Sequence, residues 1–159
     1  MSLEHLITDR TAEDVERVKL LAEKAWQDMT TEERTEWLSP LKGAYNYTDL
    51  NRVGAALNYM RDRLSASSYL QADAFTARED WRSDEIPTIP EMSAYLGYVS
   101  VIREALAQFP TTPNAPTNPN ALDYHAANNI EQILVDVDEL ITRMMAAAYY
   151  SGDLFSGEV

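Results

Sequence analysis

The sequence contains no cysteine and only two histidines, His5 and His125. Without cysteine, the chain can form no disulfide, no thiolate nucleophile and no cysteine-ligated metal site. A Ser–His–Asp arrangement would need a histidine base, and His125 falls in the first turn of a helix, where a capping or surface residue is expected. The chain has no phosphate-binding loop, dinucleotide fingerprint or Glu-x-x-His pair. We predict that the protein is not an enzyme and binds neither a metal ion nor an organic cofactor.

Positive charge is also scarce. The 13 lysines and arginines are outnumbered by 26 acidic residues, and the formal net charge is −13. Affinity for nucleic acid comes mostly from Lys and Arg on phosphates, and anionic membranes attract basic segments. We therefore expect no nucleic-acid and no membrane partner, and a basic protein surface suits this charge better. The many carboxylates leave an acid–base pair open, but no pair stands out from the rest.

Apolar runs are short throughout the chain. The longest, "MMAAAYY", falls far below the roughly 20 residues that span a bilayer. The N-terminal "MSLEHLITDR" lacks the basic region and the apolar core of a signal peptide. We expect a protein that is made in the cytoplasm and is either kept there or assembled from there into a larger structure.

Five segments have the spacing of amphipathic helices, and a polar capping residue precedes each of the first four. The predicted capping positions are Thr11 with Asp14, Thr30 or Thr31, Thr48 with Asp49 in the first turn, and Thr88 with Glu91. The residues "GAYNY" at 43–47 are typical of a structural turn rather than of a binding loop. We predict an all-α fold, a helical bundle of about four main helices plus one short helix.

Residues 67–87 lack a clear helical period. Within them, "LQADAFTAR" alternates weakly with period two, which is typical of a short strand. The alternative to a purely helical fold is a minor β element of two or three strands. It would combine the N-terminal "HLIT", the stretch at 70–77 and the C-terminal tail.

The clearest helix is predicted from about Asp123 to Tyr150. Its apolar residues fall within about 120° of one another on a helical wheel at 100° per residue. They are Ile130, Ile133, Leu134, Val137, Leu140, Ile141, Met144 and Ala148. The opposite arc carries Glu131, Asp136, Asp138, Glu139 and Arg143. We interpret this arc as a solvated face rather than a metal site.

We predict one helical domain over residues 1–159, with a stiff proline-rich connector at 109–120 and a short extended tail at 151–159. A proline-rich ligand for a small recognition module is the alternative for the connector, but strong helices flank it closely. Trp26, Trp37 and Trp81 lie near helix ends, and we interpret them as core or staple residues. The alternative for the tryptophans is a sugar-stacking platform.

The candidate partner contact lies at the C-terminus, where Tyr149, Tyr150, Leu154 and Phe155 gather in a tail with two glycines. Such a tail either folds back over the base of its own bundle, as tails often do, or docks onto a neighbouring subunit. A glycine-jointed segment is easily redirected from its own core onto a partner. Exposed aromatic residues are frequent anchors of interfaces, so association through these residues is our hypothesis.

Several stretches together resemble a group of small proteins encoded by phages and prophages of gut Firmicutes, often among tail or baseplate genes. The stretches are "LITDRTAEDVERVK", "LKGAYNYTDLNRV", "DWRSDEIPT", "NNIEQILVDVDEL" and "YSGDLFSGEV". The resemblance covers nearly the whole chain, and "DLNRV" after the "YN" turn is its most distinctive part. Residues 67–80 match least, where the family indicates a strand. The shared motifs are fold motifs, so the resemblance carries over no functional residue.

Two hypotheses follow from the resemblance and the composition. The first is a phage or prophage structural or assembly protein that contacts tail or baseplate subunits, or further copies of itself, and is incorporated in the virion. The second is a small cytoplasmic regulatory or adaptor protein that binds another protein. Neither hypothesis identifies the partner from the sequence.

Overall fold

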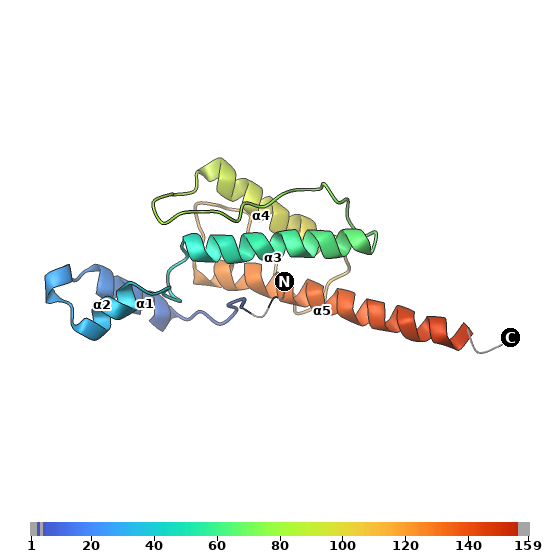
Figure 1. Ribbon diagram of the computed structural model, residues 1–159, viewed down its shortest axis with the longest axis horizontal. Coiled ribbons are helices and arrows are strands. Elements are labelled where there is room, and N and C mark those ends of the chain that lie inside the picture. Colours follow the sequence, from blue (N-terminus) through green and yellow to red (C-terminus); the bar gives the residue numbers. More distant parts are fainter. Residues whose placement is uncertain (1–2, 4, 156–159) are drawn as a thin grey trace.

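The fold is all-α, as predicted. The computed structural model describes residue 3 and residues 5–155, with side chains as far as residue 149. It has five α-helices and one short 3-10 helix: α1 Ala12–Ala22, η1 Trp26–Asp28, α2 Thr31–Trp37, α3 Tyr47–Ala66, α4 Ile89–Glu104 and α5 Tyr124–Phe155. The described residues contain no strand. Helices α3, α4 and α5 pack together, α1 and α2 project at one end, and α5 runs on past α3 at the other (Figure 1).

Reciprocal caps fix the beginnings of the helices. Thr11, Thr30 and Thr88 each accept a hydrogen bond from the third backbone N–H of their helix. This confirms the predicted caps at Thr11 and Thr88, and it decides for Thr30 over Thr31 in α2. The fourth prediction, Thr48 as the cap of α3, was wrong by two residues, since Asn46 is the cap. The Asn46 side chain accepts from the Thr48 N–H at 2.9 Å. The turn at 43–47 is therefore the structural start of α3.

The core lies between α3, α4 and α5, whose segments have the amphipathic spacing that predicts a buried face. Its members on the three helices are Leu50, Val53, Ala56, Leu57, Met60, Leu64, Tyr95, Leu96, Val99, Ile102, Ile130, Ile133, Leu134, Val137 and Ile141. The side chains of α5 beyond Ile141 are exposed as far as they are described. The packed part of α5 therefore ends well before the helix does.

The segment between α3 and α4 lies along the bundle without forming the predicted strand at 70–77. Its residues Phe75, Ala77 and Trp81 join the core, which accounts for the alternation seen in the sequence. The side chains of Asn51 and Asn58 on α3 bond its backbone, so the segment needs no neighbouring strand. The "HLIT" stretch is likewise not a strand.

Gly54 lets this segment approach α3 closely. A Cβ atom at position 54 would lie 2.2 Å from the carbonyl oxygen of Arg78. By contrast, a Cβ atom at Gly97 on α4 would meet nothing within 4 Å. The sequence places both glycines inside helices, but only Gly54 is required by packing.

The three tryptophans have different environments. Trp81 is buried in the core, as predicted. Trp26 and Trp37 are not core residues, because about half and over a third of their respective surfaces remain exposed. Arg34 lies over the Trp26 ring, with its guanidinium carbon 5.4 Å from the ring centroid. Both exposed tryptophans belong to the projecting α1–α2 end.

The connector at 109–120 is irregular, with turns at 110–111 and 119–120, and side chains of α4 and α5 bond it. Arg103 Nε donates to the carbonyl oxygen of Pro113 at 2.7 Å, and the hydroxyl of Thr112 donates to Asp136 Oδ2 at 2.6 Å. Asp136 is buried by this contact. The prediction that Asp136 faces solvent was therefore wrong.

Candidate functional site

The strongest concentration of charge inside the protein is a cluster of four side chains from three parts of the chain: Arg10, Asp49, Arg52 and Glu131. Arg10 Nη2 donates to Asp49 Oδ1 at 2.9 Å and to Glu131 Oε1 at 2.7 Å. Arg52 Nη2 donates to the same two oxygens at 2.6 and 2.9 Å. Glu131 is fully buried, so the prediction that it lies on a solvated face was wrong.

Local structure holds each member of this buried charge cluster in place. Asp49 is the third residue of α3, and its Oδ2 accepts from the Asn46 N–H at 3.0 Å while Oδ1 faces the arginines. The Asn128 side chain fixes the backbone of Arg10, accepting from its N–H at 3.0 Å and donating to its carbonyl oxygen at 2.9 Å. Glu131 also accepts from the N–H of Ile7 at 2.5 Å. The cluster therefore holds residues 7–10 against α3 and α5.

The chemistry of the cluster is that of a structural clamp. Two carboxylates face two guanidinium groups, so its formal charges cancel. Each carboxylate oxygen accepts at least one hydrogen bond. A general base needs a carboxylate that can take up a proton from a substrate. These carboxylates instead have their oxygens occupied by donors from their own chain.

Two tyrosines lie beside the cluster. The hydroxyl oxygens of Tyr45 and Tyr95 are 2.5 Å apart. The Arg10 guanidinium lies over the Tyr45 ring, 5.4 Å from its centroid. Burial raises the pKa of both phenols, and the hydrogen bond between them only partly opposes the rise for Tyr45. Both side chains therefore stay neutral over the physiological range.

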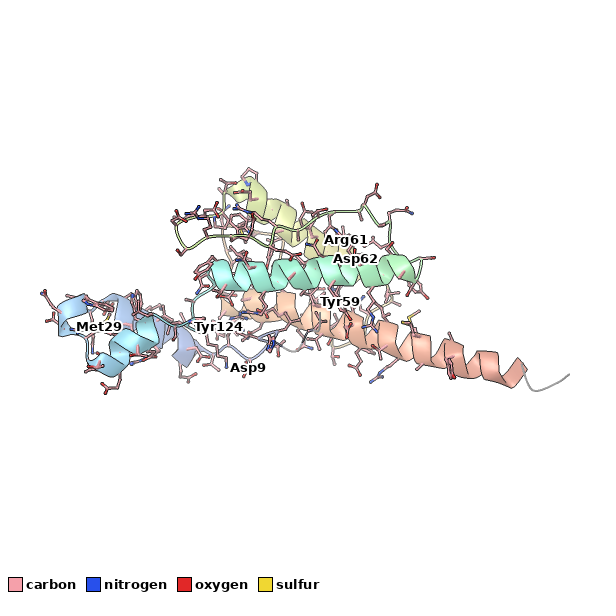
Figure 2. The ribbon with its side chains drawn as sticks, viewed as in Figure 1. Asp9, Met29, Tyr59, Arg61, Asp62 and Tyr124 are labelled. Carbon is pink, nitrogen blue, oxygen red and sulfur yellow. The ribbon has the colours of Figure 1, made fainter. Side chains whose placement is uncertain are left out.

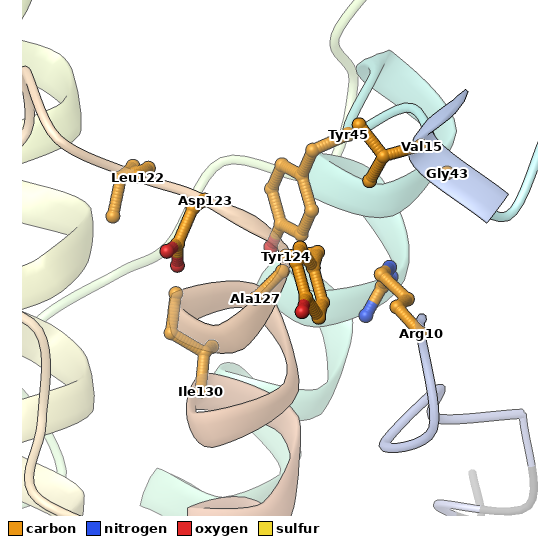
Figure 3. Close-up of a pocket in the computed structure, with 9 residues that line it drawn as sticks. All are labelled: Arg10, Val15, Gly43, Tyr45, Leu122, Asp123, Tyr124, Ala127 and Ile130. Atoms are coloured by element: carbon orange, nitrogen blue, oxygen red, sulfur yellow. The ribbon is translucent and has the colours of Figure 1, made fainter. Parts of the chain in front are cut away.

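A small cavity opens next to the cluster, between the N-terminal segment, the turn before α3 and the start of α5 (Figure 3). Its volume is about 210 Å³, and its lining is Arg10, Val15, Gly43, Tyr45, Leu122, Asp123, Tyr124, Ala127 and Ile130. Ligand pockets typically have roughly 300–1,000 Å³. The cavity is thus smaller than a typical ligand site.

His125 lies outside this cavity lining. Its ring lies against that of Tyr124, with the centroids 4.0 Å apart and the ring planes tilted by 32°, and the residue is exposed, as predicted. The searched part of the chain, residues 3 and 5–155, contains no group of three metal-ligating side chains. Figure 2 shows Tyr124 close to where the N-terminal part meets the bundle.

The predicted partner contact lies on the last turns of α5. The helix continues to Phe155, so the predicted extended tail is wrong for residues 151–155. Tyr149 is 71% exposed. The side chains of Tyr150, Leu154 and Phe155, and the whole of residues 156–159, lie outside the described residues. All four predicted contact residues therefore belong to one helix.

Sequence reasoning missed two further residues of this surface. Met144 and Met145 are 38% and 55% exposed, although Met144 belongs to the predicted buried stripe. The predicted apolar stripe of α5 extends beyond the helices that pack on it. Its length therefore indicates that the residues at its C-terminal end are exposed. Figure 1 shows the C-terminal part of α5 extending past the end of α3. We call residues 142–155 the α5 extension.

Comparison with protein-family models, with curated proteins and with solved structures finds no match. Among the described helices, none combines the length and the hydrophobicity needed to cross a membrane.

Proposed function

We propose that the protein is a non-enzymatic structural or assembly protein of a phage or prophage, which works by contact with other proteins. One observation carries the proposal: the α5 extension leaves the bundle with apolar side chains exposed. Met145 and Tyr149 have more than half of their surface open to solvent. Large apolar residues on a projecting helix are typical of a surface that another protein covers.

The opposite end of the molecule supports the same function. The α1–α2 end exposes Trp26 and Leu38, the latter to 76%. Exposed tryptophan is enriched among the anchors of protein interfaces. A molecule with apolar surface at both ends suits a component that joins two neighbours, as a subunit of a larger assembly does.

The resemblance to proteins encoded among phage tail and baseplate genes gives this function its setting. Tail and baseplate subunits act by holding one another in place, which requires contact surfaces rather than a catalytic centre. The charge of −13 favours partners with basic surfaces among those subunits. The resemblance supports the tail setting, and the exposed helix supports the mode of action.

Mass spectrometry of purified particles from an induced prophage tests the proposal. We expect the protein in the particle at a ratio comparable with that of tail subunits. Replacement of Tyr149 by Asp should lower its incorporation, whereas replacement of Ile86 by Asp, an exposed apolar residue of the segment between α3 and α4, should not. Absence from particles, together with capture of a cytoplasmic regulator, would instead support the alternative, a small cytoplasmic regulatory or adaptor protein.

A further inference from the structure

The apolar seam of α5 continues past its own bundle. Ile130, Leu134, Val137 and Ile141 alternate in steps of four and three residues, and all four are buried. Met144 and Ala148 continue the same steps but are exposed. Alternation of this kind is the spacing by which two helices pack along a shared seam. The seam of α5 therefore has a covered half and an exposed half.

The α5 extension is also nearly free of charge. Arg143 and Asp153 are its charged residues, one of each sign, in a chain with a net charge of −13. With Ile141 at position a and Met144 at position d of a heptad, Arg143 falls at position c and Asp153 at position f. Both positions lie away from the seam. An apolar seam without flanking charge can meet an identical seam without repulsion. This surface is thus complementary to itself.

We propose that the occupant of the exposed seam is the α5 extension of a second copy of the chain, in antiparallel orientation. This inference rests on the proposed function, because it names the partner of one face of the same extension, the face with Met144, Met145 and Ala148. Residues 142–155 add about 21 Å of helix beyond Ile141, at 1.5 Å per residue. Antiparallel overlap of two such extensions keeps the acidic bundles at opposite ends of the pair.

Electrostatics favours antiparallel extensions over parallel extensions and over contact of the extension with the α1–α2 end of another copy. Surface charges interact over a Debye length of about 8 Å at physiological ionic strength. Parallel extensions would bring two highly acidic bundles side by side, within that distance. Contact of the extension with the α1–α2 end of another copy would desolvate the ion pairs that Glu33 and Glu36 of α2 form with Lys24 and Arg17, which costs free energy. Antiparallel extensions avoid both costs.

The contact is short, so it falls among small interfaces, which bury less than about 1,200 Å² in total. We therefore expect a dimer that dissociates on dilution. Light scattering of the full-length protein, from low to several hundred micromolar, should show the mass rising from 18.0 kDa towards twice that value. A mass of one chain at every concentration would overturn the inference.

Variants locate the contact. The double replacement Met144→Glu and Met145→Glu should keep the helical circular dichroism and abolish the dimer, whereas Met144→Leu with Met145→Leu should retain it. Leu38→Glu, at an even more exposed apolar residue of the other end, should leave the dimer intact. A dimer that survives the glutamates, or that Leu38→Glu abolishes, would overturn the inference.

Orientation and function are tested separately. Because the chain has no cysteine, Gly97→Cys on α4 provides a single site for a spin label. Antiparallel pairing predicts no strong dipolar coupling between the two labels, and strong coupling would overturn it. A monomeric protein that still enters particles would overturn the second copy as partner and leave the proposed function intact. A dimer that never enters particles would leave the second copy as partner and overturn the proposed function.

Discussion

Asn58 holds the backbone of Ala77 by both groups of its side-chain amide. Its Nδ2 donates to the Ala77 carbonyl oxygen at 2.8 Å, and its Oδ1 accepts from the Ala77 N–H at 2.8 Å. Two turns earlier on α3, Asn51 bonds the N–H and carbonyl of Trp81 in the same way, at 2.7 and 2.9 Å. Two helix side chains thus satisfy an extended segment that would otherwise need a neighbouring strand.

Replacing Asn58 by Ala should therefore lower the free energy of unfolding by about 2 kcal/mol, since a buried backbone group left without a partner costs about 1–3 kcal/mol. Chemical denaturation measures the change. Asn129→Ala is the matched control, because Asn129 is also a partly buried helix asparagine. If the two variants were equally stable, the amide of Asn58 would not hold the segment.

The alternation of Phe75 and Ala77 shows how far the sequence determines this region. Period-two alternation predicts extended backbone with one buried face, and the segment has both features. Alternation does not reveal what bonds the backbone edge. Here the donors and acceptors come from Asn58, 19 residues away on a helix. A strand was therefore predicted where the structure has an extended segment held by side chains.

Replacing Gly54 and replacing Gly97 by Ala should change the free energy of unfolding in opposite directions. Gly54→Ala places a Cβ 2.2 Å from the Arg78 carbonyl oxygen, so α3 and the segment must separate. Overpacking of this kind costs about 1–3 kcal/mol. Gly97→Ala meets open space and should stabilise the protein by about 0.5–1 kcal/mol, because alanine favours the helix. Thermal melting of the two variants gives both signs, and stabilisation by Gly54→Ala would contradict the close approach.

Glu131→Gln should be the most damaging of the charge substitutions. It leaves the guanidinium groups of Arg10 and Arg52 with one carboxylate between them, in a buried site. Removing one partner of a buried ion pair typically costs about 3–5 kcal/mol. Glu139→Gln, in the exposed pair with Arg143, should change stability by less than about 0.5 kcal/mol. Denaturant titration of both variants checks the difference, and comparable losses would show that the cluster is not the clamp described.

The contrast between these glutamates also marks a limit of sequence reasoning. The caps at Thr11 and Thr88 were predicted correctly because both partners lie three residues apart, and Thr30 was one of two candidates for the cap of α2. The role of Glu131 depends on Arg10, which is 121 residues away. On the helical wheel Glu131 and Glu139 share the polar arc, and only tertiary packing decides which one is buried. The exposed methionines escaped prediction for the same reason.

The Tyr45–Tyr95 pair predicts loss of stability at alkaline pH. Burial raises the folded-state pKa of both phenols above the ordinary value of 10.0. Above pH 10 the unfolded chain releases these protons while the folded chain keeps them, so the free energy of unfolding falls as pH rises. Phenolate absorbance should show these two among the nine tyrosines ionising only when the protein unfolds. Replacing both by Phe should flatten the alkaline decline, and an unchanged decline would contradict the assignment.

Deleting residues 151–159 separates a tail that covers its own core from one that serves association. The last buried side chain on the described part of α5 is Ile141, and residues 142–149 are exposed. We therefore expect the free energy of unfolding of the truncated protein to lie within about 0.5 kcal/mol of that of the full chain, as is usual for surface changes. Ile141→Ala, which opens a cavity in the core, should instead cost about 2–5 kcal/mol. The truncation should also lose the dimer and its recruitment into particles, because it removes residues 151–155, more than one turn of the helix that carries the seam. A truncated protein that melts early, with its mass and its incorporation unchanged, would show that the end of the chain is a lid on the bundle.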